Sequence, residues 1–238
     1  MNVDRVSSLI DIEFAAERNT NVNAVFWDLD DTVLDTFSGR ADALTATYEE
    51  IIGERPDARE LWRMHLGVTI EALAKELTGS DWPRFVERYR AIYYASKEPL
   101  EPYPGVVETL EALSSDGLEM AIVTSKISWG ARGELERAGL LDYFAAVVGW
   151  DDCARPKPAP DPLLVAMERT GQKEPAQIAY VGDVPTDVQA ARAAGCRAIG
   201  ASWGSLDPER LRAAEPDLLA EHPSAVLAYV RRSRRPIA

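Results

Sequence analysis

The stretch that decides the fold is residues 24–36, AVFWDLDDTVLDT, in which a short apolar run ends abruptly at a cluster of carboxylates. Ala24 to Trp27 have the continuous apolar character of a buried parallel strand. Asp28 then falls at the carboxyl end of that strand, where open α/β sheets bind their ligands. Asp28 and Asp30 point the same way in extended backbone, and like charges so close favour a cation or a proton between them. The alternative is a solvated turn in which Asp and Thr cap a helix.

The composition favours a globular protein that acts on small molecules. The chain has 238 residues, of which 46% are hydrophobic, enough for a packed interior. Its 39 Asp plus Glu outnumber its 26 Lys plus Arg, which gives a net charge of −13. Such a field repels nucleic acid and anionic lipid, so we expect neither as a partner.

The cysteines and the hydropathy pattern indicate a cytoplasmic protein. Cys153 and Cys196 lie far apart in the sequence, and we expect both thiols to be reduced. The sequence shows neither a signal peptide nor an apolar run long enough to span a membrane.

The first hundred residues carry helical patterns on both sides of the quoted stretch. Apolar residues between Val3 and Phe14 follow a weak amphipathic spacing, typical either of a surface-packed helix or of a frayed terminus. Residues 38–99 show helical periodicity without a strand pattern, which predicts an inserted helical domain. Its aromatic residues are expected to fill the interior of that domain. Arg63 and His65 could instead face a substrate. The expected helices are 41–52, 59–66, 69–77 and 82–96.

From residue 106 onward, apolar strands alternate with amphipathic helices. This alternation predicts right-handed βαβ units and a doubly wound parallel α/β sheet. The tail from residue 209 reads as helical in patches. It ends in Arg231, Arg232, Arg234 and Arg235, which would contact a nucleic acid or a phosphate, or would simply be solvated. After the first strand, the expected strands are 120–123, 145–148, 177–181 and 197–200.

Polar residues recur at the carboxyl end of the predicted βα units. In a parallel sheet these ends lie side by side, which weakens the solvated-turn alternative. Carboxylates without clustered His or Cys suit Mg²⁺, which prefers oxygen ligands, and not zinc. A hydroxyl, an ammonium group and helix N-terminal N–H groups would hold phosphate oxygens. The recurring residues are Asp28, Asp30, Thr124, Lys157, Asp183 and Asp187.

With these motifs in place, the chain resembles a haloacid dehalogenase superfamily hydrolase, in the subgroup of phosphoglycolate phosphatases and related pyrophosphatases. The resemblance runs from Asn23 to about Gly204 and includes the Trp203-Gly204 pair. One departure is Asp31, where many members have Gly and others Asp. The resemblance divides the chain into an N-terminal extension (1–22), an α/β catalytic core (23–37 and 100–238) and a helical cap (38–99). The four matched motifs are Asp28-Leu29-Asp30-Asp31-Thr32, Thr124, Lys157 within RPKPAPD, and Gly182-Asp183-Val184-Pro185-Thr186-Asp187.

The resemblance implies a Mg²⁺-dependent phosphatase that hydrolyses a small phosphorylated metabolite through an aspartyl-phosphate. Asp28 would be the nucleophile and Asp30 the general acid and base. Mg²⁺ would be held by the Asp28 carboxylate and the backbone carbonyl of Asp30. Asp183 would complete this set, with Asp187 acting directly or through water. The phosphate-binding residues would be Thr124, Ser125 and Lys157, and the cap would close over the site and choose the leaving group.

The sequence excludes other activities of the same superfamily to different degrees. The full carboxylate set argues against a dehalogenase, whereas a phosphomutase is excluded only weakly. A phosphonate hydrolase would add a cap lysine that forms a Schiff base, and the cap lysines are Lys75 and Lys97. A binding protein with a retired site is disfavoured by the intact carboxylates. The sequence leaves open the exact substrate, phosphoglycolate-like ester or pyrophosphate, and whether the protein is a monomer or a homodimer.

Overall fold

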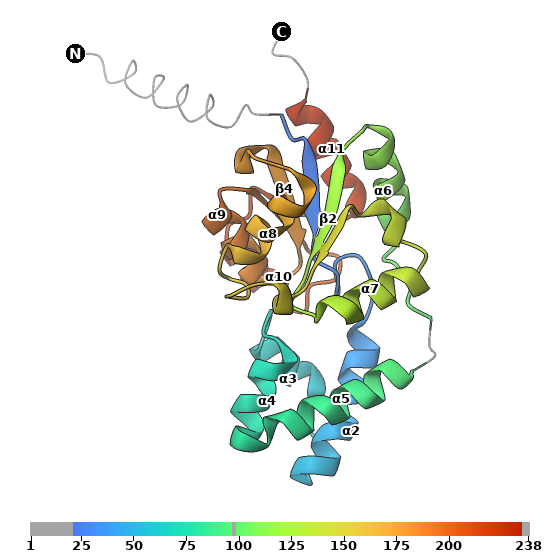
Figure 1. Ribbon diagram of the computed structural model, residues 1–238, viewed down its shortest axis with the longest axis vertical. Helices are drawn as coiled ribbons and strands as arrows, with labels where there is room; N and C mark the ends of the chain where they lie inside the picture. Colours follow the sequence, from blue (N-terminus) through green and yellow to red (C-terminus); the bar gives the residue numbers. More distant parts are fainter. Residues whose placement is uncertain (1–20, 97–98, 235–238) are drawn as a thin grey trace, which may run out of the picture.

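The centre of the molecule is a parallel sheet between two layers of helices. The computed structural model describes residues 21–96 and 99–234. In this part of the chain, parallel strands pair in the order β3-β2-β1-β4-β5-β6. They are β1 (Ala24–Trp27), β2 (Glu119–Val123), β3 (Ala146–Val148), β4 (Ile178–Gly182), β5 (Arg197–Ala201) and β6 (Leu218–Ala220). The predicted doubly wound α/β fold is confirmed (Figure 1).

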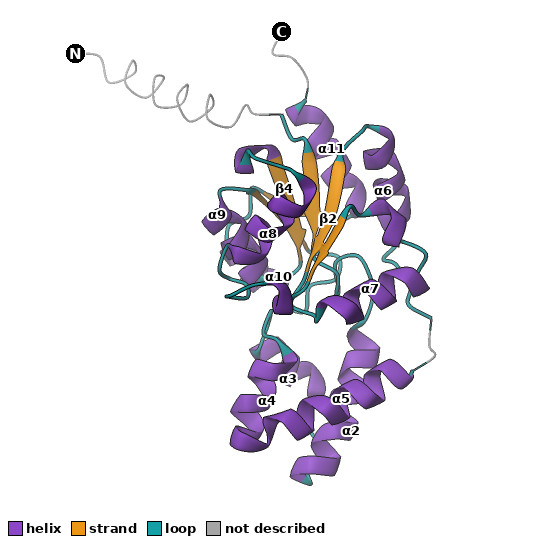
Figure 2. Cartoon of the chain, in the orientation of Figure 1, coloured by secondary structure: helices purple, strands orange, loops and turns teal. Residues whose placement is uncertain are grey.

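The strands are buried on both faces, which explains their unbroken apolar sequence. In β1 all residues are buried, but successive side chains enter different cores. Val25 and Trp27 belong to one hydrophobic cluster, and Ala24 and Phe26 to the other. Figure 2 shows the strands enclosed by helices on both sides.

Two sets of helices cover the two faces. The first cluster is closed by α6 (Val106–Ser115), α7 (Ser128–Arg137) and α11 (Pro223–Ser233). The second is closed by α8 (Asp161–Thr170), α9 (Pro185–Ala194) and α10 (Pro208–Ala213). Short 3₁₀ turns cover Leu141–Tyr143, Trp150–Asp152 and Pro175–Gln177. Within residues 21–96 and 99–234, none of the helices has both the length and the apolar character needed to cross a bilayer.

The helices between β1 and β2 form a group with its own hydrophobic cluster. They are α2 (Phe37–Ile52), α3 (Ala58–Met64), α4 (Ile70–Thr78) and α5 (Trp82–Ala95), with a 3₁₀ turn at Gly79–Asp81. Leu44, Leu73 and Phe85 are fully buried in this cluster. Figure 1 shows the group at one end of the molecule, beyond the sheet. We call α2 to α5 the cap helices, and propose that they form the cap that the sequence suggests.

The structure differs from the sequence-based expectation mainly in the last thirty residues. Strand β6 lies where the sequence suggests patches of helix, because a three-residue strand shows too little of the period-two pattern to be recognised. It pairs with β5 and extends the sheet. The helical pattern between Val3 and Phe14 lies outside the described residues.

The arginines near the C-terminus are partly tied to the core. Arg231 forms an ion pair of 2.7 Å with Asp116, and Arg234 donates to the Asp116 backbone carbonyl at 3.0 Å. These contacts attach α11 to the end of α6, a structural role that the arginine run does not suggest. Arg235 lies outside the described residues.

The loop that follows β1 is held by the segment after β5. Asp31 has φ of 58°, in the left-handed region where Gly is favoured and Asp is tolerated. Both Gly and Asp can adopt this conformation, in keeping with the two residues that the resemblance allows there. The indole Nε1 of Trp203 donates to the Thr32 carbonyl at 3.0 Å. A Cβ on Gly204 would lie only 1.8 Å from the Asp31 carbonyl oxygen, so the close approach requires glycine.

We therefore expect Gly204→Ala to destabilise the fold by about 1 to 3 kcal/mol, because the added methyl group meets backbone that has little freedom to move. The matched control is Gly133→Ala in α7. No atom lies within 4 Å of a Cβ built at that position. The control should gain about 0.5 to 1 kcal/mol through helix propensity. Urea unfolding of both variants measures the difference, and equal stability of the two would contradict the proposed close approach.

Candidate active site

The carboxyl ends of the central strands bring the predicted site residues together. Asp28 follows β1, Thr124 follows β2 and Asp183 follows β4. The ladder continues one residue past β1 and β2, because Asp28 N donates to Val181 O at 2.8 Å and Thr124 N to Val148 O at 2.9 Å. These bonds fix the backbone of the site residues to the sheet.

Three buried carboxylates meet at this edge. Asp28, Asp183 and Asp187 each offer an oxygen, and these atoms all lie within 4.8 Å of one another. Asp187 lies in the first turn of α9, and its Oδ2 accepts from Val184 N at 3.1 Å. A Cβ on Gly182 would lie 2.2 Å from Asp187 Oδ2, so glycine is needed for this approach.

Lys157 supplies the positive charge next to these carboxylates. Its Nζ is 2.6 Å from Asp187 Oδ1 and 3.1 Å from Asp28 Oδ1, and the side chain is almost fully buried. It also donates to the Tyr180 hydroxyl at 2.9 Å. That hydroxyl lies 2.7 Å from the Val123 carbonyl oxygen, which anchors the network to β2. Because its partners are carboxylates, the pKa of Lys157 is raised despite burial.

The carboxylate group has the properties of a divalent cation site. Burial raises the pKa of Asp28 to about 7, against the opposing effect of Lys157, and Asp187 and Asp30 add repulsion. The pKa of Asp183 is raised well above its usual range, first by burial and then by neighbouring carboxylates. Asp28 Oδ1 is buried and accepts no well-directed hydrogen bond. A donor set of oxygens only, whose negative charge one ammonium group offsets in part, fits Mg²⁺.

The side chain of Asp30 contacts residues outside this carboxylate group. Its Oδ1 accepts from Thr36 Oγ1 at 2.5 Å and from Lys126 Nζ at 2.8 Å. Burial would raise the pKa of Asp30, but Lys126 and Arg40 outweigh it and lower the pKa to about 2. In this arrangement Asp30 is therefore an ionised carboxylate, and it must gain a proton before it can act as an acid.

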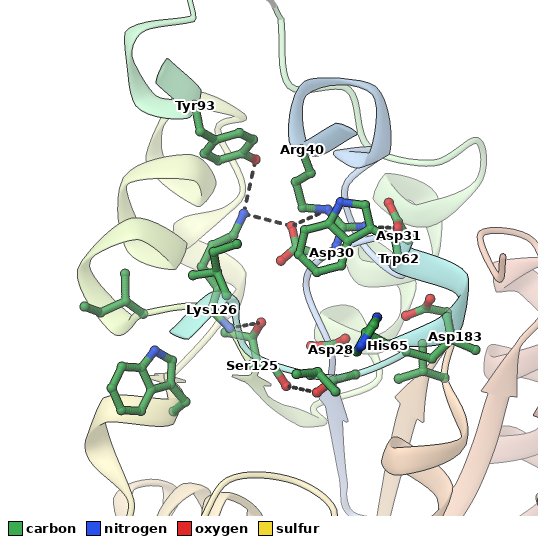
Figure 3. Close-up of a pocket in the computed structure, with 18 of the residues that line it drawn as sticks. Asp28, Asp30, Asp31, Arg40, Trp62, His65, Tyr93, Ser125, Lys126 and Asp183 are labelled. Carbon is green, nitrogen blue, oxygen red and sulfur yellow. Dashed lines mark hydrogen bonds and ion pairs between the residues drawn. The ribbon is translucent and has the colours of Figure 1, made fainter. Parts of the chain in front are cut away.

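Lys126 links Asp30 to the cap helices. Its Nζ contacts both carboxylate oxygens of Glu134, at 2.7 Å and 2.5 Å. Figure 3 shows its contacts with Asp30 and with the hydroxyl of Tyr93, the latter at 3.2 Å. Tyr93 belongs to α5, so this one ammonium group contacts the core and the cap helices together. Arg40 of α2 approaches Asp30 from the other side and pairs with Asp31.

The predicted phosphate-binding residues surround the same point. Thr124 Oγ1 accepts from Lys126 N at 3.1 Å. The Ser125 hydroxyl donates to the Gly67 carbonyl at 3.1 Å, a contact with the loop between α3 and α4. A Cβ on Gly67, which has φ of 75°, would lie 1.9 Å from Thr186 Oγ1. The cap loop therefore rests directly on the core beside the site.

The cap residues named in the sequence analysis have different surroundings in the structure. Arg63 pairs with Asp207 of the core at 2.9 Å and so joins the two parts of the chain instead of facing a substrate. His65 lines the pocket between the carboxylates and the cap helices, and its Nδ1 lies 2.8 Å from the Leu61 carbonyl oxygen. The Lys75 ammonium lies over the Trp82 ring, 4.7 Å from its centroid. Lys97 lies outside the described residues.

Sequence reasoning assigns no role to several residues that the structure places here. Lys126 directly follows Thr124 and Ser125, which is the one local signal that could have found it. Tyr180 reads as an ordinary strand residue, although a tyrosine in a buried strand needs a partner for its hydroxyl. Glu134 and Arg40 reach the site from helices, and no local pattern marks them.

The chain is similar in sequence to known hydrolases. The family described as haloacid dehalogenase-like hydrolase matches residues 25–201. A protein named "Probable phosphatase IndB" from Dickeya dadantii (strain 3937) is 36% identical over 211 residues, which are 85% of this chain and 91% of that protein. A phosphoglycolate phosphatase from Salmonella choleraesuis (strain SC-B67) is 32% identical, over 84% of this chain and 88% of the relative.

Solved structures show the same architecture. A haloacid dehalogenase-like family hydrolase from Streptococcus pneumoniae superposes with a TM-score of 0.76 at 29% identity, over 87% of this chain and 98% of that one. A predicted phosphoglycolate phosphatase from Haemophilus somnus 129PT gives a TM-score of 0.80 at 23% identity, over 88% and 98% of the two chains. The family match spans most of the chain, and its ends fall within strands β1 and β5. The chain therefore belongs to the haloacid dehalogenase-like hydrolase family.

Proposed function

We propose that this protein is a Mg²⁺-dependent phosphatase that hydrolyses a small phosphorylated metabolite through an aspartyl-phosphate on Asp28. The observation that carries the proposal is the buried group of Asp28, Asp183 and Asp187 with Lys157 in contact. A carboxylate nucleophile needs its charge offset before it approaches an anionic phosphate, and this group supplies both a cation site and a fixed ammonium. The phosphatase names of the relatives support the same reaction class.

The residues divide the reaction into two displacements. In the first, an oxygen of Asp28 attacks phosphorus, the bond to the leaving oxygen breaks, and Asp30, which takes up a proton when the substrate binds, gives that proton to the leaving oxygen. In the second, a water gives a proton to Asp30 and attacks the same phosphorus, which frees Asp28 and releases inorganic phosphate. Thr124, the Ser125 backbone N–H and Lys157 hold the phosphoryl oxygens. The proton balance closes because Asp30 donates once and accepts once.

The proposed metal ligands are the carboxylates of Asp28 and Asp183, the backbone carbonyl of Asp30, and Asp187 directly or through water. When bound, Mg²⁺ supplies charge that offsets the repulsion between nucleophile and phosphate. Lys157 also offsets the repulsion between nucleophile and phosphate, because it pairs with both Asp28 and Asp187.

The structure argues against some of the alternative activities more strongly than against others. A phosphonate hydrolase would need a lysine beside the leaving group, and Lys75 instead lies against Trp82. A dehalogenase has no use for the buried carboxylate group. A phosphomutase would share the residues and differ in shielding the aspartyl-phosphate from water. Since the relatives are named phosphatases, we propose hydrolysis.

Removal of divalent metal should abolish phosphate release, because Lys157 alone offsets only part of the charge that the three carboxylates present to phosphate. We expect EDTA to stop turnover of p-nitrophenyl phosphate, Mg²⁺ to restore it, and Mg²⁺ to raise the melting temperature of the metal-free protein. Undiminished turnover after exhaustive chelation would contradict a metal-dependent mechanism.

Asp28→Asn should remove turnover while keeping the fold. The substitution deletes the nucleophile and relieves repulsion in a site where burial already raises the pKa of this carboxyl. We expect less than about a thousandth of the wild-type rate, with an unchanged or higher melting temperature. Asp142→Asn, in a 3₁₀ turn of the α/β core, is the matched control and should retain full turnover. A larger residual rate in Asp28→Asn would mean that another group attacks phosphorus.

Asp30→Asn separates covalent chemistry from direct attack of water on the substrate. An activated aryl phosphate needs little protonation of its leaving oxygen, so the first displacement should survive better than the second. We expect a burst of phenol followed by slow turnover in a rapid-quench experiment. Intact mass should show one added phosphoryl group, which peptide mapping should place on Asp28. Slow turnover with neither burst nor adduct would argue for direct attack.

A further inference from the structure

The chamber between the carboxylates and the cap helices is lined mainly by apolar side chains. Its free volume is about 100 Å³. Carboxylates and predicted phosphate-binding groups lie at its floor, and aromatic and aliphatic side chains form the wall (Figure 3). The wall residues used below are Trp62, Ile70, Tyr89, Tyr93 and Tyr94.

The aromatic part of the wall is preorganised. Tyr89 and Tyr93 stack with centroids 5.9 Å apart, and Tyr94 meets Tyr93 edge-on at 5.1 Å. Such a wall offers rigid ring surface to a flat ligand at little entropic cost. Part of that surface is already covered, because Lys126 Nζ lies over the Tyr93 ring, 4.9 Å from its centroid, and the Arg40 guanidinium lies over the Trp62 ring at 5.2 Å. Trp62 Nε1 is buried and has no hydrogen-bond partner within the described chain, which leaves one donor for an acceptor on the ligand.

The cations that line the chamber are already paired. Arg40 pairs with Asp31, Arg90 pairs with Glu71, and Lys126 pairs with both Asp30 and Glu134. The side chain of His65 lies against the Leu61 carbonyl and Glu76. A carboxylate on the leaving group would therefore lose its hydration without gaining an uncommitted cation. It would also be repelled by the aspartates of the floor.

We propose that the chamber selects phosphomonoesters whose leaving group is an aromatic ring on a short alkyl arm, in preference to leaving groups that carry a carboxylate. This inference rests on the proposed phosphatase function and names the substrate class of that site. The phosphate would sit at the carboxylates, and the ring would lie against Tyr89, Tyr93 and Trp62. Phosphoglycolate, which lacks a ring and brings a carboxylate, is then a poor substrate.

The test compares 2-phenylethyl phosphate, ethyl phosphate and phosphoglycolate with Mg²⁺. All three release primary alkoxides, so differences in kcat/KM report mainly on the chamber. We expect 2-phenylethyl phosphate to exceed both others by roughly tenfold to a hundredfold, from burial of the ring. Equal values, or a preference for phosphoglycolate, would overturn the inference.

A specificity variant sharpens the comparison. Ile70→Lys places an uncommitted cation in the wall and should raise kcat/KM for phosphoglycolate while lowering it for 2-phenylethyl phosphate. Leu164→Lys, at a 47% exposed position of α8, is the matched control and should change neither value. A uniform loss with every substrate in Ile70→Lys would show that this position does not set the preference, and would count against the chamber as the selector.

Binding separates this inference from the proposed function. Calorimetric titration of Asp28→Asn with Mg²⁺ and each of the three esters does not require turnover. If no ester is hydrolysed by the wild type but 2-phenylethyl phosphate binds the variant most tightly, the proposed function fails and the substrate class stands. If the wild type hydrolyses esters but phosphoglycolate binds the variant as tightly as 2-phenylethyl phosphate or more tightly, the proposed function stands and the proposed substrate class fails. Absence of binding by all three would overturn the inference as well.

Discussion

The structure depends on one costly interaction, the burial of three carboxylates within 4.8 Å of one another at the end of a parallel sheet. Like charges at this distance in a poorly hydrated place repel strongly. Lys157 offsets part of this charge from one side, and the Tyr180 hydroxyl fixes that lysine to β2. The surrounding fold holds the carboxylates where the repulsion cannot separate them. Strand pairing fixes Asp28 and Asp183, and the absence of a side chain at Gly182 lets Asp187 approach.

A second, separate charge network determines how the site meets the cap helices. Asp30 lies two residues after Asp28, yet its side chain is held by Thr36, Lys126 and Arg40, away from the group of three carboxylates. Because Lys126 also reaches Tyr93, the proposed acid and base is held by residues of both the core and the cap helices. In the proposed reaction, holding a cation and moving a proton would thus belong to neighbouring residues with different partners. This separation keeps one carboxyl shielded by positive charge while another is driven toward neutrality by burial.

The sequence predicted the features that local patterns encode. The alternation of apolar strands and amphipathic helices predicted the doubly wound sheet, and the recurrence of polar residues at strand ends pointed to residues that the structure brings together at one edge of the sheet. The three-residue strand β6 escaped prediction because so short a segment has no usable periodicity. The partners of Asp30 also escaped, since Arg40 and Glu134 lie on amphipathic helices and become neighbours only in three dimensions. Arg63 was misleading for the same reason, because its partner Asp207 lies far along the chain.

The contact between the cap loop and the core has a consequence for how such enzymes diversify. Gly67 donates no side chain, accepts a hydrogen bond from Ser125 at 3.1 Å, and leaves no room for a methyl group before Thr186. The two parts of the chain therefore meet where one backbone carbonyl contacts Ser125, which follows β2, and where glycine passes close to Thr186 at the start of α9. A chimaera that takes the helices α2 to α5 from a relative would keep this junction only if its loop also placed a glycine there. Exchange of these helices between relatives is therefore constrained at this loop.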